Sequence, residues 1–150
     1  MKTVRIQKEA FDVNAAIADL TRRRSDVGAI VTFSGHVRAD DGLTALALEH
    51  YPGMTEREIG HCVDEAMRRW PLTGATVIHR VGRLVPGDAI VLVVTASRHR
   101  DAAFSATEFL MDYLKTRAPF WKEEVRGAET RWVEARSSDA DRAKRWKSSR

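Results

Sequence analysis

Apolar residues recur along the chain with two different spacings, which predict where strands and helices lie. Alternation of apolar and polar residues is typical of a strand with one buried face, and an unbroken apolar run is typical of a central strand. These patterns predict strands at residues 3–7, 28–38, 43–51, 75–83, 89–96, 120–125 and 131–135. Helical spacing predicts helices that start at Asp12 or Asn14, at Thr55 and near Asp101, and a polar terminal helix at 139–147.

The turns between these elements carry predictions of their own. Residues 39–42, Ala-Asp-Asp-Gly, predict a hairpin that pairs the strands at 28–38 and 43–51. Thr55 and Glu58 have the spacing of a capping box at the start of the clearest helix. The apolar face of that helix is predicted to carry Ile59, Cys62, Val63, Ala66, Met67 and Trp70.

The same spacing predicts which side chains of the strands and helices face the core. In the strand at 28–38, the odd positions, Phe33 among them, are predicted to face the core. In the third helix, Phe104 is predicted to lie beside the apolar stripe. The charge runs at 22–24 and 142–147 are interpreted as solvated surface.

The order of the elements predicts an α+β domain, a sandwich of a mixed or antiparallel sheet with helices. Neither a GxGxxG nor a GxxxxGK loop lies between a strand and a helix, which argues against a doubly wound nucleotide-binding fold. No repeat or long linker divides the chain. Residues 1–150 are therefore predicted to form one domain, with a polar basic tail from about residue 137.

Composition narrows the class of protein. The 150 residues carry a net charge of +4, which mildly favours anionic partners. Cys62 is the only cysteine and excludes a disulfide framework. The five histidines show no metal-ligand spacing, so neither a metal site nor another cofactor is predicted. The N-terminus does not resemble a signal peptide and no apolar run is long enough to span a membrane, which predicts a soluble cytoplasmic protein.

Lys115 and Lys122 are separated by a proline that changes how they are presented. Pro119 is incompatible with a continuing helix, so the helix is predicted to end between Lys115 and Arg117. Lys122 then lies on the following strand. Two cations held by two rigid elements across a tight turn are suited to flank an anion, although solvated surface lysines are the alternative.

Three further residues are candidate cations. His99 and Arg100 lie where a buried strand gives way to a helix, a position that suits a phosphate. Arg38 ends a strand beside a turn. For all three, simple solvent exposure is the alternative. Cys62 falls on an apolar helix face and is predicted to be a core residue, which leaves the chain without an evident nucleophile.

Several segments resemble the catalytic (large) subunit of molybdopterin synthase. The resemblance covers nearly the whole chain and is most specific in the segment Met-Asp-Tyr-Leu-Lys-Thr-Arg-Ala-Pro-Phe-Trp-Lys-Glu-Glu at 111–124. Other matching segments are Phe-Ser-Gly-His-Val-Arg at 33–38, Leu-Glu-His-Tyr-Pro-Gly-Met-Thr-Glu at 48–56, Val-Ile-His-Arg-Val-Gly at 77–82, Pro-Gly-Asp at 86–88, Ser-Arg-His-Arg at 97–100 and Arg-Trp-Val-Glu-Ala at 131–135.

The resemblance implies an α/β hammerhead-like fold and a sulfurtransferase that converts cyclic pyranopterin monophosphate into molybdopterin. The sulfur comes from the C-terminal Gly-Gly thiocarboxylate of a small ubiquitin-like carrier subunit, and the family forms a heterotetramer around a homodimer of large subunits. Lys115 and Lys122 correspond to the family's critical lysines. The substrate-binding residues implied are His36, Val37, Arg38, His99, Arg100, Lys115, Lys122, Glu123 and Glu124.

The rival hypothesis is a non-enzymatic basic module of α+β type that binds RNA through a sheet face. Aromatic and basic residues adjoin at 120–122, as in such modules. Against this hypothesis, the RNP-type aromatic motif is absent and the net charge is modest. Nucleic acid is therefore not expected as a partner.

Overall fold

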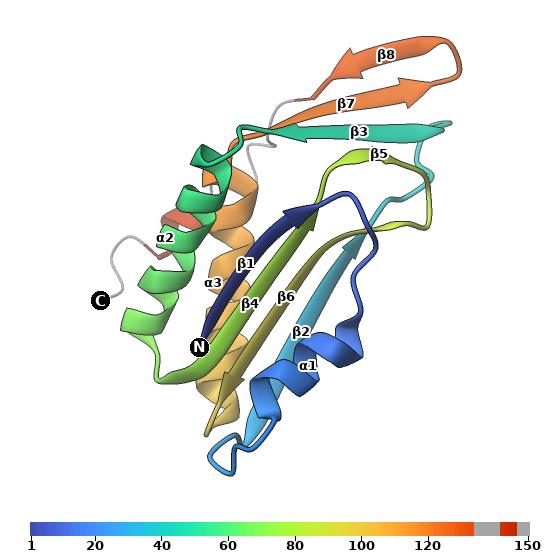
Figure 1. The fold of residues 1–150 in the computed structure, drawn as a ribbon. Coiled ribbons are helices and arrows are strands. Elements are labelled where there is room, and N and C mark those ends of the chain that lie inside the picture. Colours follow the sequence, from blue (N-terminus) through green and yellow to red (C-terminus); the bar gives the residue numbers. More distant parts are fainter. Residues whose placement is uncertain (134–141, 147–150) are drawn as a thin grey trace.

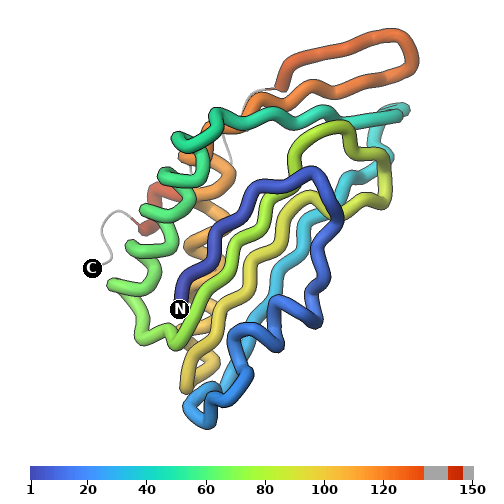
Figure 2. The backbone as a smooth tube through the Cα atoms, viewed as in Figure 1, coloured from blue at the N-terminus to red at the C-terminus, as the bar shows by residue number. Residues whose placement is uncertain are grey.

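The computed structural model describes residues 1–133 and 142–146, which form two β-sheets, the three helices α1 to α3 and a short helical segment at 142–144 (Figures 1 and 2). The strands are β1 (Lys2–Gln7), β2 (Ala29–His36), β3 (Ala45–His50), β4 (Leu72–Arg80), β5 (Gly82–Leu84), β6 (Ala89–Ser97), β7 (Phe120–Arg126) and β8 (Glu129–Trp132). The helices are α1 (Val13–Thr21), α2 (Met54–Arg69) and α3 (Arg100–Arg117). The predicted α+β class is confirmed.

The first sheet has the strand order β1-β4-β6-β2 and is mixed, because β1 runs parallel to β4 while the other pairs are antiparallel. Helices α2 and α3 cover one face and α1 covers the other (Figure 1). Side chains of β6 alternate between the two cores: Val91 and Val93 pack toward α2 and α3, whereas Leu92 and Val94 pack toward α1. The prediction that this apolar run is a central strand covered on both faces is confirmed.

The second sheet has the order β5-β3-β7-β8 and is antiparallel. It lies across one end of the first sheet, where β7 follows directly from the end of α3 (Figure 1). Leu46, Leu48 and Leu84 form a third core cluster between the sheets, with Phe120 packed against it.

The predicted hairpin at 39–42 is wrong. Strand β2 pairs with β6, and β3 pairs with β5 and β7 in the other sheet. The connection is longer than a hairpin turn because Val37 and Leu43 are buried in the third core cluster, so residues 37–44 carry the chain from one sheet to the other. The predicted strand at 75–83 is likewise two strands, β4 and β5, divided at Val81 next to Gly82 with a φ of +93°.

Local details also differ from the predictions. Helix α2 begins after Gly53, where the carboxylate of Glu56 accepts from the Gly53 amide at 2.9 Å; Gly53 has no side chain to complete a capping box. Thr55 is instead buried, with its hydroxyl bonded elsewhere. Phe33 and Phe104 are exposed, Phe33 because β2 is an edge strand. The helix start at Asp12 is confirmed, since its carboxylate accepts from the amide of Ala15 at 3.0 Å.

The C-terminal charge run at 142–147 is not simply solvated surface. Asp112 on α3 is buried, and its Oδ2 accepts from Arg145 Nη2 and from Trp146 Nε1, both at 2.7 Å. The Trp146 ring also packs edge-on against Trp70 and Phe109. This part of the chain therefore docks on α2 and α3. Of the terminal helix predicted at 139–147, residues 142–144 are helical, whereas residues 134–141 and 147–150 lie outside the described residues.

Candidate functional site

Lys115 and Lys122 lie on either side of the turn that ends α3. The helix ends at Arg117, Ala118 is extended, and β7 begins at Phe120, as the position of Pro119 predicted. Lys115 is exposed in the last turn of α3, and Lys122 is half-buried on β7. Lys122 pairs with Leu48 of β3, which places it on the inner face of the second sheet with Phe120.

A partly buried histidine lies within the electrostatic influence of both lysines. The ring of His79, near the end of β4, stacks on Phe120 with a centroid distance of 3.9 Å and an interplanar angle of 20°. The pKa of His79 is lowered to about 4, mainly by burial and also by the positive charges of Lys115, His50 and Lys122, against a hydrogen bond to the backbone that raises it. His79 is therefore neutral at pH 7.

The hydrogen bond of His79 defines its tautomer. Its Nδ1 lies 2.8 Å from the carbonyl oxygen of Arg80, which can only accept, so Nδ1 carries the proton and donates. We refer to Lys115, Lys122, His79 and Phe120 together as the lysine site. Sequence reasoning missed His79, because its role depends on strand β4 ending beside β7.

The two glutamates that follow Lys122 point to opposite faces of β7. Glu124 shares the face of Lys122 and forms an ion pair with Arg126, with Oε1 and Nη1 3.1 Å apart. Glu123 lies on the face of Trp121. A groove of about 510 Å³ near the β7–β8 hairpin is lined by Asp41, Glu124, Arg126, Glu129, Thr130 and Arg131.

The residues around the end of β2 differ in accessibility. His36 forms a short hydrogen bond with the hydroxyl of Ser34. The Val37 side chain is buried, and its backbone amide donates to the carbonyl of Asp88 at 2.9 Å. Arg38 is exposed and pairs with Asp40, with Nε and Oδ2 3.2 Å apart. Arg38 is thus accessible as a cation, whereas the amide and the carbonyl of Val37 are both already hydrogen-bonded, the carbonyl to the amide of Gly87 at 2.8 Å.

His99 and Arg100 lie at the opposite end of α3 from Lys115. His99 is the N-cap residue and Arg100 opens the helix, as predicted. Fifteen helical steps separate Arg100 from Lys115, which corresponds to about 22 Å along the axis. A single chain therefore brings Lys115 and Lys122 together but keeps His99 and Arg100 away from them.

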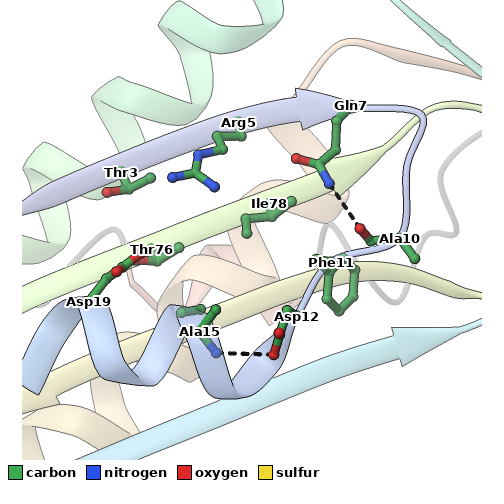
Figure 3. Close-up of a pocket in the computed structure, with 11 residues that line it drawn as sticks. Thr3, Arg5, Gln7, Ala10, Phe11, Asp12, Ala15, Asp19, Thr76 and Ile78 are labelled. Atoms are coloured by element: carbon green, nitrogen blue, oxygen red, sulfur yellow. Dashed lines mark hydrogen bonds between the residues drawn. The ribbon is translucent and has the colours of Figure 1, made fainter.

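Another pocket, of about 170 Å³, lies between β1 and α1 (Figure 3). The polar side chains of Arg5, Gln7, Asp12 and Asp19 line it. It opens on the α1 side of the first sheet, away from the face that α2 and α3 cover. None of the residues predicted to bind substrate lines this pocket.

Comparison with known proteins identifies the family. A family model described as the MoaE protein matches residues 6–117, which is most of the chain. The chain belongs to the MoaE family. The molybdopterin synthase catalytic subunit of Mesorhizobium japonicum is 63% identical over 150 residues, covering 98% of this chain and 94% of that protein. This match, unlike the family model, extends through β7 and Lys122.

Solved structures agree with the MoaE assignment. The molybdopterin biosynthesis MoaE protein of Burkholderia ambifaria MC40-6 superimposes with a TM-score of 0.85 at 50% identity, covering 97% of this chain and 98% of that one. A chain in the complex of subunits 1 and 2 of the molybdopterin-converting factor from Helicobacter pylori 26695 shares the fold, with a TM-score of 0.75 at 20% identity, and covers 89% of this chain and 92% of its own.

The sequence-based identification as a catalytic subunit of molybdopterin synthase, a sulfurtransferase of molybdenum cofactor biosynthesis, is confirmed, which sets the RNA-binding hypothesis aside. Across residues 1–133 and 142–146, no group of three or more His, Cys, Asp or Glu side chains is arranged to hold a metal ion. The helices of the described chain include none that is long and apolar enough to cross a membrane.

Proposed function

We propose that this MoaE chain transfers sulfur from the C-terminal Gly-Gly thiocarboxylate of a small ubiquitin-like carrier subunit to cyclic pyranopterin monophosphate, which forms the dithiolene of molybdopterin. The observation that carries the proposal is the presentation of Lys115 and Lys122 from α3 and β7 across one tight turn. Such an arrangement suits an anionic substrate and a reaction in which negative charge develops.

The nucleophile in this reaction is the sulfur of the carrier. The only thiol of the chain, Cys62, is buried in the core, and burial raises the pKa of this thiol to about 11, so it stays protonated at neutral pH. The large subunit therefore binds, orients and stabilises charge while the attacking sulfur arrives on the partner.

The two lysines have different roles in the proposal. The C-terminal end of α3 carries partial negative charge, which attracts the ammonium group of Lys115. Lys115 then stabilises the oxyanion that forms at the carrier's acyl carbon, or gives a proton to a leaving oxygen of the substrate. Lys122, half-buried beside Phe120, holds the substrate or the intermediate.

A second copy of the chain accounts for the candidates that are remote from the lysine site. We assign the phosphate and the polar edge of the pterin to Arg38, His99 and Arg100, with His36, Val37, Glu123 and Glu124 lining the site. Because about 22 Å of helix separates Arg100 from Lys115, His99 and Arg100 would be supplied by the partner in a homodimer. That dimer is the centre of the proposed heterotetramer, with one carrier subunit at each end.

The decisive experiment measures dithiolene product from the purified protein, the thiocarboxylated carrier and cyclic pyranopterin monophosphate. Lys115→Ala is expected to lower turnover on the order of a hundredfold to a thousandfold, because a group that stabilises developing charge is lost. Lys8→Ala, another exposed lysine but in the loop after β1, is the matched control and should keep full turnover. Unchanged turnover in Lys115→Ala would remove Lys115 from the mechanism.

A further inference from the structure

Thr55, the second residue of α2, is fully buried, and its hydroxyl joins two segments beside the lysine site. The hydroxyl oxygen accepts from the amide of Tyr51 at 2.9 Å, and the hydroxyl donates to the carbonyl of Pro119 at 3.0 Å. The amide of Thr55 donates to the carbonyl of Tyr51, also at 2.9 Å. Thr55 is thus fixed to the corner between β3 and α2, and its side chain holds the turn at Pro119.

That turn is the only covalent connection between the elements that carry the two lysines. Ala118 and Pro119 alone separate the end of α3 from the start of β7. Proline has no backbone N–H, so the carbonyl that Thr55 binds is the one hydrogen-bonding group of the Pro119 backbone. The amide of Phe120 donates to the carbonyl of Ala118 at 3.0 Å, which keeps the turn tight.

We propose that Thr55 is a positioning residue for sulfur transfer, whose hydroxyl holds the Pro119 turn and thereby sets the separation of Lys115 and Lys122. The inference rests on the function proposed above. Thr55 acts through Pro119 and needs no contact with the substrate. Small displacements of catalytic groups have large effects on rate, since a misplacement of about 1 Å can cost on the order of a hundredfold.

Three substitutions of Thr55 separate the hydroxyl from the shape of the side chain. Thr55→Val keeps the branched shape but removes the donor and the acceptor, and turnover should fall on the order of tenfold or more with a smaller change in KM. Thr55→Ser keeps the hydroxyl and should restore most of the turnover. Thr55→Cys keeps a weak donor and should fall between the two, and it replaces Thr55→Val if that variant does not fold.

A buried threonine elsewhere provides the matched control. Thr95 on β6 is also fully buried, and its hydroxyl donates to the carbonyl of Ala103 at 2.9 Å, near the start of α3 and far from the Pro119 turn. Thr95→Val removes a comparable buried hydroxyl, so it should lower the unfolding temperature in a similar way. Its turnover should nevertheless match that of the unsubstituted protein.

Amide hydrogen exchange of the peptide covering residues 116–122 gives a readout that does not depend on activity. Thr55→Val should exchange faster there, and Thr95→Val should not. Equal turnover in Thr55→Val and Thr95→Val, or unchanged exchange in Thr55→Val, would overturn the inference. If the unsubstituted protein transfers no sulfur, the proposed function is wrong, while the exchange result still decides whether Thr55 holds the turn.

Discussion

The two sheets differ in how much of their surface they bury. In the first sheet, Leu92, Val93 and Val94 of β6 are completely inaccessible to solvent, because both faces of the strand are covered. In the second sheet, Trp121 and Trp132 are 48% and 58% exposed, yet this sheet carries Lys122. The molecule therefore separates the part that provides stability from the part that presents chemistry.

The separation has a physical basis. A central strand with neighbours on both sides and helices on both faces removes the most apolar area from water. A sheet that receives a substrate must instead leave polar groups and strand ends accessible. His79 and Phe120 stack where the two sheets meet, so this contact ties the accessible sheet to the buried one.

The largest change in stability is expected in the first sheet. Leu92→Ala removes a side chain that packs among Ile78, Leu20 and Ala16 with no route for solvent to fill the space. Truncation of a fully buried leucine costs about 2–5 kcal/mol of unfolding free energy. Urea denaturation checks this value, and a cost below about 1 kcal/mol would contradict the division between the sheets.

The contact between the sheets should make stability depend on pH. His79 has a pKa of about 4 in the folded protein and 6.5 as an ordinary histidine, so between these values the unfolded chain binds the proton and the folded chain does not. Stability should therefore fall as pH falls below 6.5, by about 2 kcal/mol between about pH 7.5 and pH 5.

A comparison with a variant that cannot titrate at this position measures how much of the pH dependence of stability comes from His79. His79→Gln keeps a side chain that can donate to the Arg80 carbonyl but does not titrate. Urea denaturation of both proteins at both pH values should give a smaller loss of stability for His79→Gln. Parallel losses in the two proteins would show that His79 is protonated in the folded state, and that the junction between the sheets is open to water.

The smallest change in stability is expected from a substitution on the exposed face of the second sheet. Trp132 contacts Trp121 edge-on at a centroid distance of 5.8 Å, but more than half of its surface is already in water. Trp132→Ala should cost less than about 1 kcal/mol, as for most surface substitutions. A thermal unfolding curve tests this, and a cost equal to that of Leu92→Ala would remove the distinction between the sheets.

Local patterns predicted most of the elements but not how the strands pair. The buried strand β6, the apolar face of α2 and the end of α3 before Pro119 all follow from spacing and backbone chemistry within one segment. The hairpin at 39–42 failed because its turn residues also suit a longer connection between two sheets. The pairing of β3 with β7 joins residues 70 to 80 positions apart in the sequence, and no local pattern encodes such a pairing.

The residues of the candidate site could likewise be predicted only where the sequence carries a local signal. The lysines could be found because both flank a proline that determines the local geometry. His79 and Thr55 could not be found in this way. His79 stacks on Phe120, and Thr55 donates to the carbonyl of Pro119, and both contacts are visible only in the folded structure. Thr55 even carries a misleading signal, since the N-cap residue of α2 is Gly53, whose amide donates to Glu56, and not the Thr55 that the sequence predicted.

The strand pairing also has a consequence for the order in which the molecule can assemble during synthesis. All four strands of the first sheet are present once the chain has been made as far as Ser97. Strand β3 must then wait for β7, whose last residue is Arg126, before its second edge is paired. Helix α3, which covers one face of that sheet, and β7 are synthesised only afterwards, so the lysine site is among the last parts of the fold to be completed.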